Sequence, residues 1–174
     1  MDNGGVVISR DYGFPNFPPG YRFKPDDDEL INFYLVNKIK NHSLPPNKIS
    51  EVNFYKYNPE QLAANYPHYE EEEWYFFTSR DRKYPKGSRP SRSAGCGFWK
   101  ASGVDKEITS NGKTVGTKKT LVFYKKKTEQ GKKDEKTEWI MQEYVLADDT
   151  TSPPPPKVPT TMKVHNFSSC FEII

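Results

Sequence analysis

The sequence predicts an α+β domain in which helices come first and an antiparallel sheet follows. Apolar residues recur at helical spacing over 26–40, near the start of the chain. From Glu73 onward the pattern changes to short aromatic and β-branched runs separated by turn residues. At least five such runs follow one another at short intervals, which is typical of an antiparallel sheet.

The strongest helix prediction covers Asp26 to Lys40. Asp26 can cap the first turn, and Glu29, three residues later, can complete a capping box. The run Leu44-Pro45-Pro46 is expected to stop the helix. Its apolar face is predicted to consist of Leu30, Phe33, Tyr34 and Val36.

Shorter segments lie on either side of this helix. Residues 1–16 are Gly-rich and are expected to form a flexible lead, and residues 17–23 an extended segment fixed by prolines. A short second helix is predicted after Asn58, which can act as its cap, with Pro59 at the first helical position. Tyr66-Pro67 should end it.

The sheet is predicted from segments rich in aromatic and β-branched residues. They are 74–77, 95–100, the arms of a hairpin at Ile108 and Thr114-Val115, 120–124 and 138–146. The hairpin is predicted from Asn111-Gly112, a dipeptide that suits a two-residue turn. A lysine- and glycine-bearing loop over 125–136 should join the last two strands.

A domain boundary is expected after residue 147. Residues 148–152 are polar, and the four prolines at 153–156 predict a polyproline-type linker. We therefore divide the chain into a lead (1–16), a domain (17–147) and a linker with a short tail (148–174). The mildly apolar end, 162–174, could pack back on the domain or remain loose.

Composition excludes several classes of protein. No apolar stretch approaches the roughly 20 residues that span a bilayer, and the N-terminus has no signal-peptide pattern, so an intracellular protein without membrane contact is expected. The 2 cysteines and 3 histidines are scattered, which predicts neither a disulfide framework nor a metal site. No cofactor is expected.

The sequence offers no support for an enzyme. Gly112-Lys113-Thr114 resembles the end of a phosphate-binding loop, but the motif requires a glycine at the position of Glu107. Gly-x-Ser-x-Gly is absent, and no histidine has an evident nucleophile or carboxylate partner. We therefore assign no catalytic residues.

Positive charge is concentrated in one block. Between Arg80 and Lys136 the chain carries 17 Lys and Arg against 6 Asp and Glu, although its net charge is only +3. Such a block can be a solvated surface or the footprint of a phosphate-bearing partner. Arginines interleaved with Pro and Gly over 80–92 favour the second interpretation, because guanidinium forks suit phosphate oxygens and guanine edges.

The segment after this loop could enter a groove of nucleic acid. The small residues of 94–97 permit close backbone approach, and 98–103 could form an edge strand. Trp99 has two possible roles, in that strand or in the core, and the core is favoured.

Six ordered blocks of the chain resemble the plant NAC transcription-factor domain. They are residues 17–30 (FPPGYRFKPDDDEL), 74–77 (WYFF), 80–92 (RDRKYPKGSRPSR), 98–106 (FWKASGVDK), 115–124 (VGTKKTLVFY) and 136–146 (KTEWIMQEYVL). The resemblance covers about 17–147. It implies a twisted antiparallel sheet flanked by a few helices, without a helix-turn-helix.

The resemblance also implies a function. It predicts a nuclear, sequence-specific transcription factor that binds double-stranded DNA with a CGT-type core as a homodimer or as a heterodimer with other NAC proteins. An edge strand would enter the major groove while a basic face meets the phosphates. The residues implied at the DNA are Lys83, Arg89, Arg92, Trp99, Lys100, Ala101, Ser102, Gly103, Lys106, Lys118, Lys119, Lys125 and Lys126.

Dimerisation is implied for the N-terminal part of the domain. The implied interface residues are Phe17, Arg22, Asp26, Glu29 and Tyr34, with Arg22 and Glu29 paired across the two-fold axis. Glu29 is also the capping-box residue, and one carboxylate cannot fully serve both roles. Asp26 departs from the threonine usual in the family and adds negative charge beside Glu29.

The length of the chain leaves a second function open. About 28 residues follow the domain, where the family usually carries a long regulatory tail, so the chain is expected to be a short member or a fragment. A tail-less protein could act mainly as a heterodimerising competitor or repressor of full-length relatives. A general RNA or polyanion binder is a third alternative.

Overall fold

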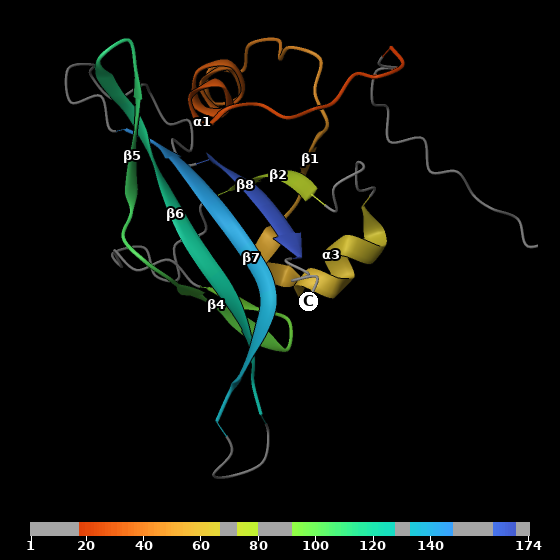
Figure 1. Cartoon of the computed structure of the whole chain (residues 1–174). Helices are drawn as coiled ribbons and strands as arrows, with labels where there is room; N and C mark the ends of the chain where they lie inside the picture. Colours follow the sequence, from red (N-terminus) through yellow and green to blue (C-terminus); the bar gives the residue numbers. More distant parts are fainter. Residues whose placement is uncertain (1–17, 67–72, 80–91, 128–132, 148–161, 170–174) are drawn as a thin grey trace, which may run out of the picture.

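The computed structural model describes residues 18–66, 73–79, 92–127, 133–147 and 162–169. They form a twisted sheet with a few helices (Figure 1), which confirms the predicted α+β class. The strands are β1 (Ile49–Glu51), β2 (Glu73–Ser79), β3 (Ser93–Ala94), β4 (Gly97–Ala101), β5 (Lys106–Ser110), β6 (Lys113–Lys125), β7 (Glu135–Leu146) and β8 (Met162–Ser169). The helices are α1 (Asp27–Glu29), η1 (Leu30–Leu35), α2 (Val36–Ile39), η2 (Phe54–Lys56) and α3 (Pro59–Asn65).

The strands follow the order β1-β2-β8-β7-β6-β4-β3, and β5 also pairs with β6. All of these pairings are antiparallel except that of β1 with β2, which is parallel. The sheet is therefore antiparallel as predicted, with one parallel pair at the β1 edge.

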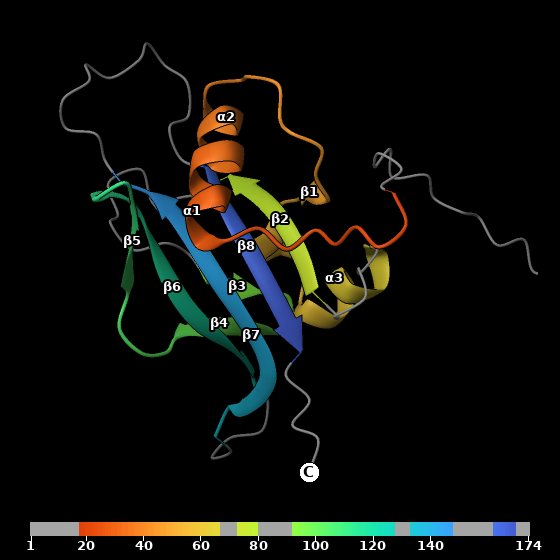
Figure 2. The same ribbon diagram turned by 45° about the horizontal axis from the view of Figure 1, so that its top comes forward.

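The first helix runs without interruption through α1, η1 and α2. The predicted capping box is present at its start, where the Glu29 carboxylate accepts a hydrogen bond from the Asp26 amide at 2.8 Å. Its middle, η1, is a π-helical segment. This helix lies across one face of the sheet, over β7 and β8 (Figure 2).

The helix ends at its predicted residue, Lys40, through a cap of its own. Asn41 adopts a φ of 55°, and the amides of Asn41 and His42 bond to the carbonyls of Lys38 and Asn37 at 3.2 and 2.9 Å. These two bonds form a Schellman motif, which satisfies the last carbonyls of the helix. The predicted end at Lys40 is therefore confirmed, but this cap makes it and Leu44-Pro45-Pro46 does not.

The buried face of the helix also differs from the predicted one. Phe33 is 53% exposed, whereas Ile31 and Leu35 are fully buried. With Leu30 and Tyr34 they pack on the sheet at helical spacing. Phe33 was wrongly assigned to the apolar face.

The second helix, α3, matches its prediction. Asn58 caps it: its side-chain oxygen accepts from the Gln61 amide at 2.8 Å, and Gln61 accepts in turn from the Asn58 amide at 3.0 Å. Pro59 takes the first helical position and Tyr66 caps the end.

The proline-rich entry to the domain is not fully extended. The Tyr21 amide bonds to the Pro18 carbonyl at 3.0 Å, and Gly20 has a φ of 85°. Positive φ at the third position of a Pro-Pro-Gly-Tyr turn is what a type II turn requires. The expectation of an extended segment over 17–23 is therefore wrong at this turn.

The predicted hairpin connects β5 and β6. Asn111 and Gly112 both have positive φ, 50° and 75°, as a two-residue type I′ turn requires. The segments predicted separately at 114–115 and 120–124 belong to one strand, β6.

Alternating side chains of β2 explain the aromatic run 74–77. Tyr75 and Phe77 join the cluster beneath the first helix, whereas Trp74 and Phe76 join a second cluster on the opposite face with Phe54 and Leu62. Because both faces of β2 are covered, every residue of the run is buried.

Residues 162–169 lie inside the sheet. They form β8, between β2 and β7 and antiparallel to both. Of the two alternatives for the end of the chain, packing back on the domain therefore holds for residues 162–169. The boundary at residue 147 stays a prediction.

Candidate nucleic-acid interface

The sheet edge has a local excursion between β4 and β5. Both strands pair with β6, and the flanking pairs are Ala101 with Leu121 and Lys106 with Lys118. Four residues, 102–105, therefore face only residues 119 and 120 of β6. The surplus backbone must leave the plane of the sheet, so this segment projects from the edge.

The excursion is fastened on both sides. The Ser102 amide bonds to the Thr120 carbonyl at 2.9 Å, and the Lys119 ammonium lies 2.8 Å from the Asp105 carboxylate. Gly103 has a φ of 77°, a conformation that glycine adopts at little cost. Ala101, Ser102 and Gly103 are all exposed, as contact residues would need to be.

Cationic side chains flank the excursion. Lys100 and Lys106 are exposed on its two sides. The Lys100 ammonium lies 5.4 Å from the centroid of the Tyr124 ring, which is stacked on Phe98 at 5.7 Å. This aromatic support holds a positive charge at the rim of the edge.

Trp99 does not lie at the surface. It is 1% exposed and packs against Phe54 and Phe123, with ring centroids 5.7 and 5.2 Å away. Its place among the DNA contacts is therefore corrected to the core, the role that the residue pattern favoured. Trp99 holds β4 in place while its neighbour Lys100 faces outward, because successive strand residues alternate.

The same alternation separates Lys118 from Lys119. Lys119 points to the excursion, whereas the Lys118 ammonium lies 2.5 Å from the carboxylate of Asp27 on α1. Lys118 also lies 5.8 Å from the ring centroid of Tyr144. The structure therefore directs Lys118 toward the first helix, and its assignment as a backbone contact beside Lys119 stays a prediction.

Asp27 connects the first helix to the sheet. Besides Lys118, it accepts a hydrogen bond from the Tyr144 hydroxyl at 2.7 Å. Burial, and then the hydrogen bond and charge of Asp27, raise the pKa of Tyr144. Tyr144 therefore remains a neutral donor well into alkaline solution.

The lysines at the end of β6 are arranged differently from one another. The Lys125 ammonium lies 2.7 Å from the Glu60 carboxylate of α3, and the hydrogen bond and charge of Glu60 raise its pKa. Lys126 is exposed, and its amide bonds to the Cys96 carbonyl at 3.1 Å. Lys126 is thus the better placed of the two for a phosphate.

The arginine-bearing loop is described only at its end. Lys83 and Arg89 lie outside the described residues. Arg92 is partly exposed, and its carbonyl accepts the Trp99 amide at 2.8 Å. Arg92 is therefore fixed directly beside β4.

The residues implied in dimerisation cluster at the start of the first helix. Arg22, Asp26 and Glu29 are exposed, and Phe17 lies outside the described residues. Tyr34 is 9% exposed and packs edge-on against Phe23 at 5.5 Å. Most of its ring therefore belongs to the monomer core. Burial, followed by the neighbouring Tyr21 and Glu29, raises the pKa of Tyr34.

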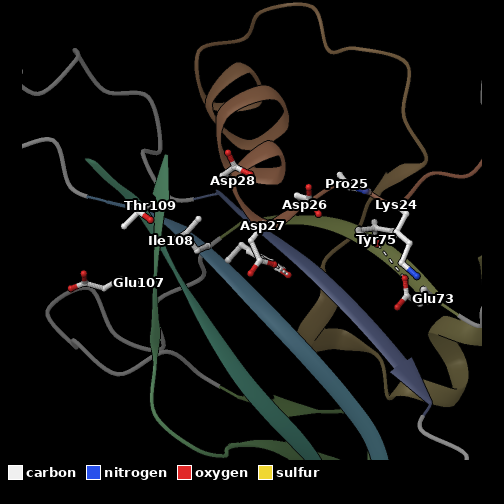
Figure 3. A pocket seen from close by; sticks show the side chains of 11 residues that line it. Lys24, Pro25, Asp26, Asp27, Asp28, Glu73, Tyr75, Glu107, Ile108 and Thr109 are labelled. Carbon is white, nitrogen blue, oxygen red and sulfur yellow. Dashed lines mark hydrogen bonds between the residues drawn. The ribbon is translucent and has the colours of Figure 1, made fainter. Parts of the chain in front are cut away.

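An acidic cleft lies beside this helix start, and the sequence alone did not indicate it. Its volume is about 550 Å³, and five carboxylates line it. Figure 3 shows Asp26, Asp27 and Asp28 at the start of the helix, between Glu73 on one side and Glu107 on the other. This negative charge disfavours phosphate and separates the helix start from the basic edge.

Two negative findings apply to the described part of the chain. It contains no helix long and apolar enough to cross a membrane. It also contains no group of three or more His, Cys, Asp or Glu side chains that could hold a metal ion, and none is formed in the acidic cleft.

The fold and its edge define a class: an α+β domain whose sheet presents a basic, projecting edge. Comparison with known proteins identifies the family. The family model described as "No apical meristem (NAM) protein" matches residues 18–146. The chain belongs to this family, whose curated relatives are named NAC proteins, and the resemblance is thereby confirmed.

The relatives are plant proteins. The chain is 53% identical over 133 residues to "NAC domain-containing protein 2" of Oryza sativa subsp. japonica, covering 76% of this chain and 41% of that protein. It is 52% identical over 131 residues to "NAC domain-containing protein JA2" of Solanum lycopersicum, covering 75% and 36%. It is 53% identical over 132 residues to "NAC transcription factor 32" of Arabidopsis thaliana, covering 76% and 50%.

These matches set the scope of the comparison. The chain spans half or less of the length of each of these relatives. Their names are those of NAC-domain proteins and a transcription factor, in agreement with the prediction that the chain is not an enzyme.

Proposed function

We propose that this chain is a sequence-specific, double-stranded DNA-binding transcription factor of the NAC type. The observation that carries the proposal is the excursion 102–105, fastened to β6 and flanked by Lys100 and Lys106. The major groove admits a β-ribbon, and a projecting edge with cations on both sides suits a groove between two phosphate backbones. The name of the Arabidopsis relative, a NAC transcription factor, supports the same function.

In this proposal the contacts fall into two groups. Lys100 and the backbone of 101–103 face the bases, whereas Arg92, Lys106 and Lys126 face phosphates, together with Lys83 and Arg89 of the loop. Phosphate contacts supply affinity that depends on salt, and base contacts supply the preference for a CGT-type core.

Binding to a palindromic CGT-type duplex and to a scrambled duplex over a salt series tests the proposal. We expect tighter binding to the palindrome, and the logarithm of the binding constant should fall linearly with the logarithm of salt concentration. Lys126→Ala should reduce that slope by about one contact, whereas Lys100→Ala should also narrow the gap between the two duplexes. Lys40→Ala, an equal loss of charge at the exposed end of the first helix, is the matched control. Equal affinity for both duplexes would reject sequence-specific binding.

We propose that the chain binds DNA as a dimer through the start of the first helix. Arg22 and Glu29 are exposed there, as a pair across a two-fold axis must be. Arg22→Glu should shift the mass in light scattering toward the monomer, and Arg22→Glu combined with Glu29→Arg should restore the dimer. A double variant that stays as monomeric as the single one would reject this pair.

A nuclear location follows from the proposed function. A fluorescent fusion of the chain in plant cells should accumulate in the nucleus. A fusion protein that stays outside the nucleus would count against the proposal.

A further inference from the structure

The tip of the excursion carries an apolar side chain. Val104 is 88% exposed, against 53% for Phe33, 43% for Tyr21 and 39% for Tyr57, the other large apolar side chains that stand out from the described surface. A valine this exposed buries almost no area within its own chain, so packing of the monomer does not account for it.

The backbone holds Val104 outward. Ser102 is bonded to Thr120 on one side, and Asp105 is paired with Lys119 on the other. A Cβ added at Gly103 would meet nothing within 4 Å, so the neighbouring backbone is surrounded by open space. The side chain is thus presented in a fixed place, and little ordering would be needed when a partner binds.

The surroundings of Val104 indicate a polyanion as the partner. Lys100 and Lys106 are exposed on the two strands that flank it, and Lys119 lies at its base. A purely apolar protein surface would have to desolvate these charges, whereas a DNA groove offers phosphates on both walls.

The chemistry of valine then restricts what it can recognise. It has no hydrogen-bond donor or acceptor, so it can distinguish bases only by apolar contact. In the major groove the thymine C5-methyl is the apolar group that the base edges offer. We propose that Val104 contacts the C5-methyl of a thymine, so that the affinity of this chain for DNA depends on that methyl. This inference rests on the proposed function.

Replacement of thymine by deoxyuridine removes the methyl and nothing else. In the palindromic duplex, each thymine and its symmetry mate are replaced in turn, and binding of the full chain is measured by fluorescence anisotropy. One position in each half-site should lose affinity about threefold to fivefold per methyl, the value expected for one buried methyl group. The other positions should change little.

Variants at Val104 connect the effect to this side chain. In Val104→Ala the penalty for deoxyuridine at the sensitive position should disappear, and Val104→Thr, of the same shape, should keep part of it. A second pair of duplexes carries either cytosine or 5-methylcytosine at that position. The wild type should bind the methylated duplex several times more tightly, and Val104→Ala should bind the two equally. Val104→Ala should unfold at the wild-type temperature, and a clear loss of stability would overturn the premise that the side chain is free of packing.

The outcomes separate the two proposals. A chain that selects the palindrome but shows no methyl-sensitive position, or shows the same sensitivity in Val104→Ala, overturns the role of Val104 alone. A chain that does not select the palindrome overturns the proposed function and this inference together.

Discussion

Asp27 should be a principal attachment of the first helix to the sheet, and Asp27→Ala tests this. One carboxylate oxygen accepts from the Tyr144 hydroxyl and the other meets Lys118. A hydrogen bond to a charged group contributes about 1.5–3 kcal/mol, and Tyr144 is 3% exposed, so its hydroxyl would lose this acceptor in a buried place. The ion pair adds at most about 0.5 kcal/mol, since 42% of the Asp27 side chain is exposed. We expect a total loss of about 2–3 kcal/mol.

Urea unfolding followed by tryptophan fluorescence measures this loss. Thermal unfolding should show a midpoint lower by roughly 5–10 °C for a chain of this size. Asp27→Asn keeps an acceptor for Tyr144 and should cost less than half as much. Asp28→Ala removes the same charge from the next residue and loses one hydrogen bond from Ser110. Because Ser110 is only partly buried, its hydroxyl can bond to water instead, and this variant should cost about 1 kcal/mol or less. A loss below about 0.5 kcal/mol in Asp27→Ala, or an equal loss in Asp27→Asn, would refute the reasoning.

Three further predictions concern the fold. Gly97→Ala should lower the free energy of unfolding by about 3 kcal/mol or more, because the added Cβ would meet the Tyr124 carbonyl oxygen. In Gly103→Ala the added Cβ meets no atom, so only the positive φ counts and the loss should be about 1 kcal/mol. Equal losses in thermal unfolding would contradict this. A chain ending at Leu146 loses β8 and should show no cooperative unfolding by circular dichroism, and a transition at the wild-type temperature would disprove the need for β8. Tyr144→Phe should leave the native absorbance titration between about pH 9 and 11 unchanged, because the pKa of Tyr144 is raised from 10.0. A smaller titration step in the variant would be contrary evidence. The neutral phenol contributes its full stability below the pKa that Tyr144 has in the unfolded chain, and progressively less as the pH rises above that value.

Elements defined by local chemistry were predictable from the sequence. Asn58 and Pro59 mark the start of α3 because a cap and a fixed φ act within one turn. Asn111-Gly112 marks the hairpin because few residues tolerate positive φ twice in succession. In both cases, the residues that carry the signal also make the structure.

Elements that depend on distant partners were not predictable. β1 is three residues long and exists through its pairing with β2. Nothing in 162–169 alone distinguishes a loose end from an interior strand, since the pairing energy comes from β2 and β7.

The candidate site shows the same division. The positive charge of the edge was evident from composition, but the partners of individual lysines were not. Lys118 and Lys119 are identical neighbours in sequence, yet the pleat of β6 sends one to Asp27 and the other to Asp105. Asp27 is far from Lys118 along the chain, so only the fold brings this pair together.

The interior position of β8 has a consequence for the synthesis of the protein. Trp74 pairs with Phe167 in the sheet, so β2 leaves the ribosome long before its antiparallel neighbour does. Until then the run 74–77 has aromatic side chains and an unpaired backbone edge, the combination most prone to associate with other chains. Contacts of such long sequence separation also slow folding. Newly made chains should therefore depend on chaperones during this interval more than the stability of the finished domain would suggest.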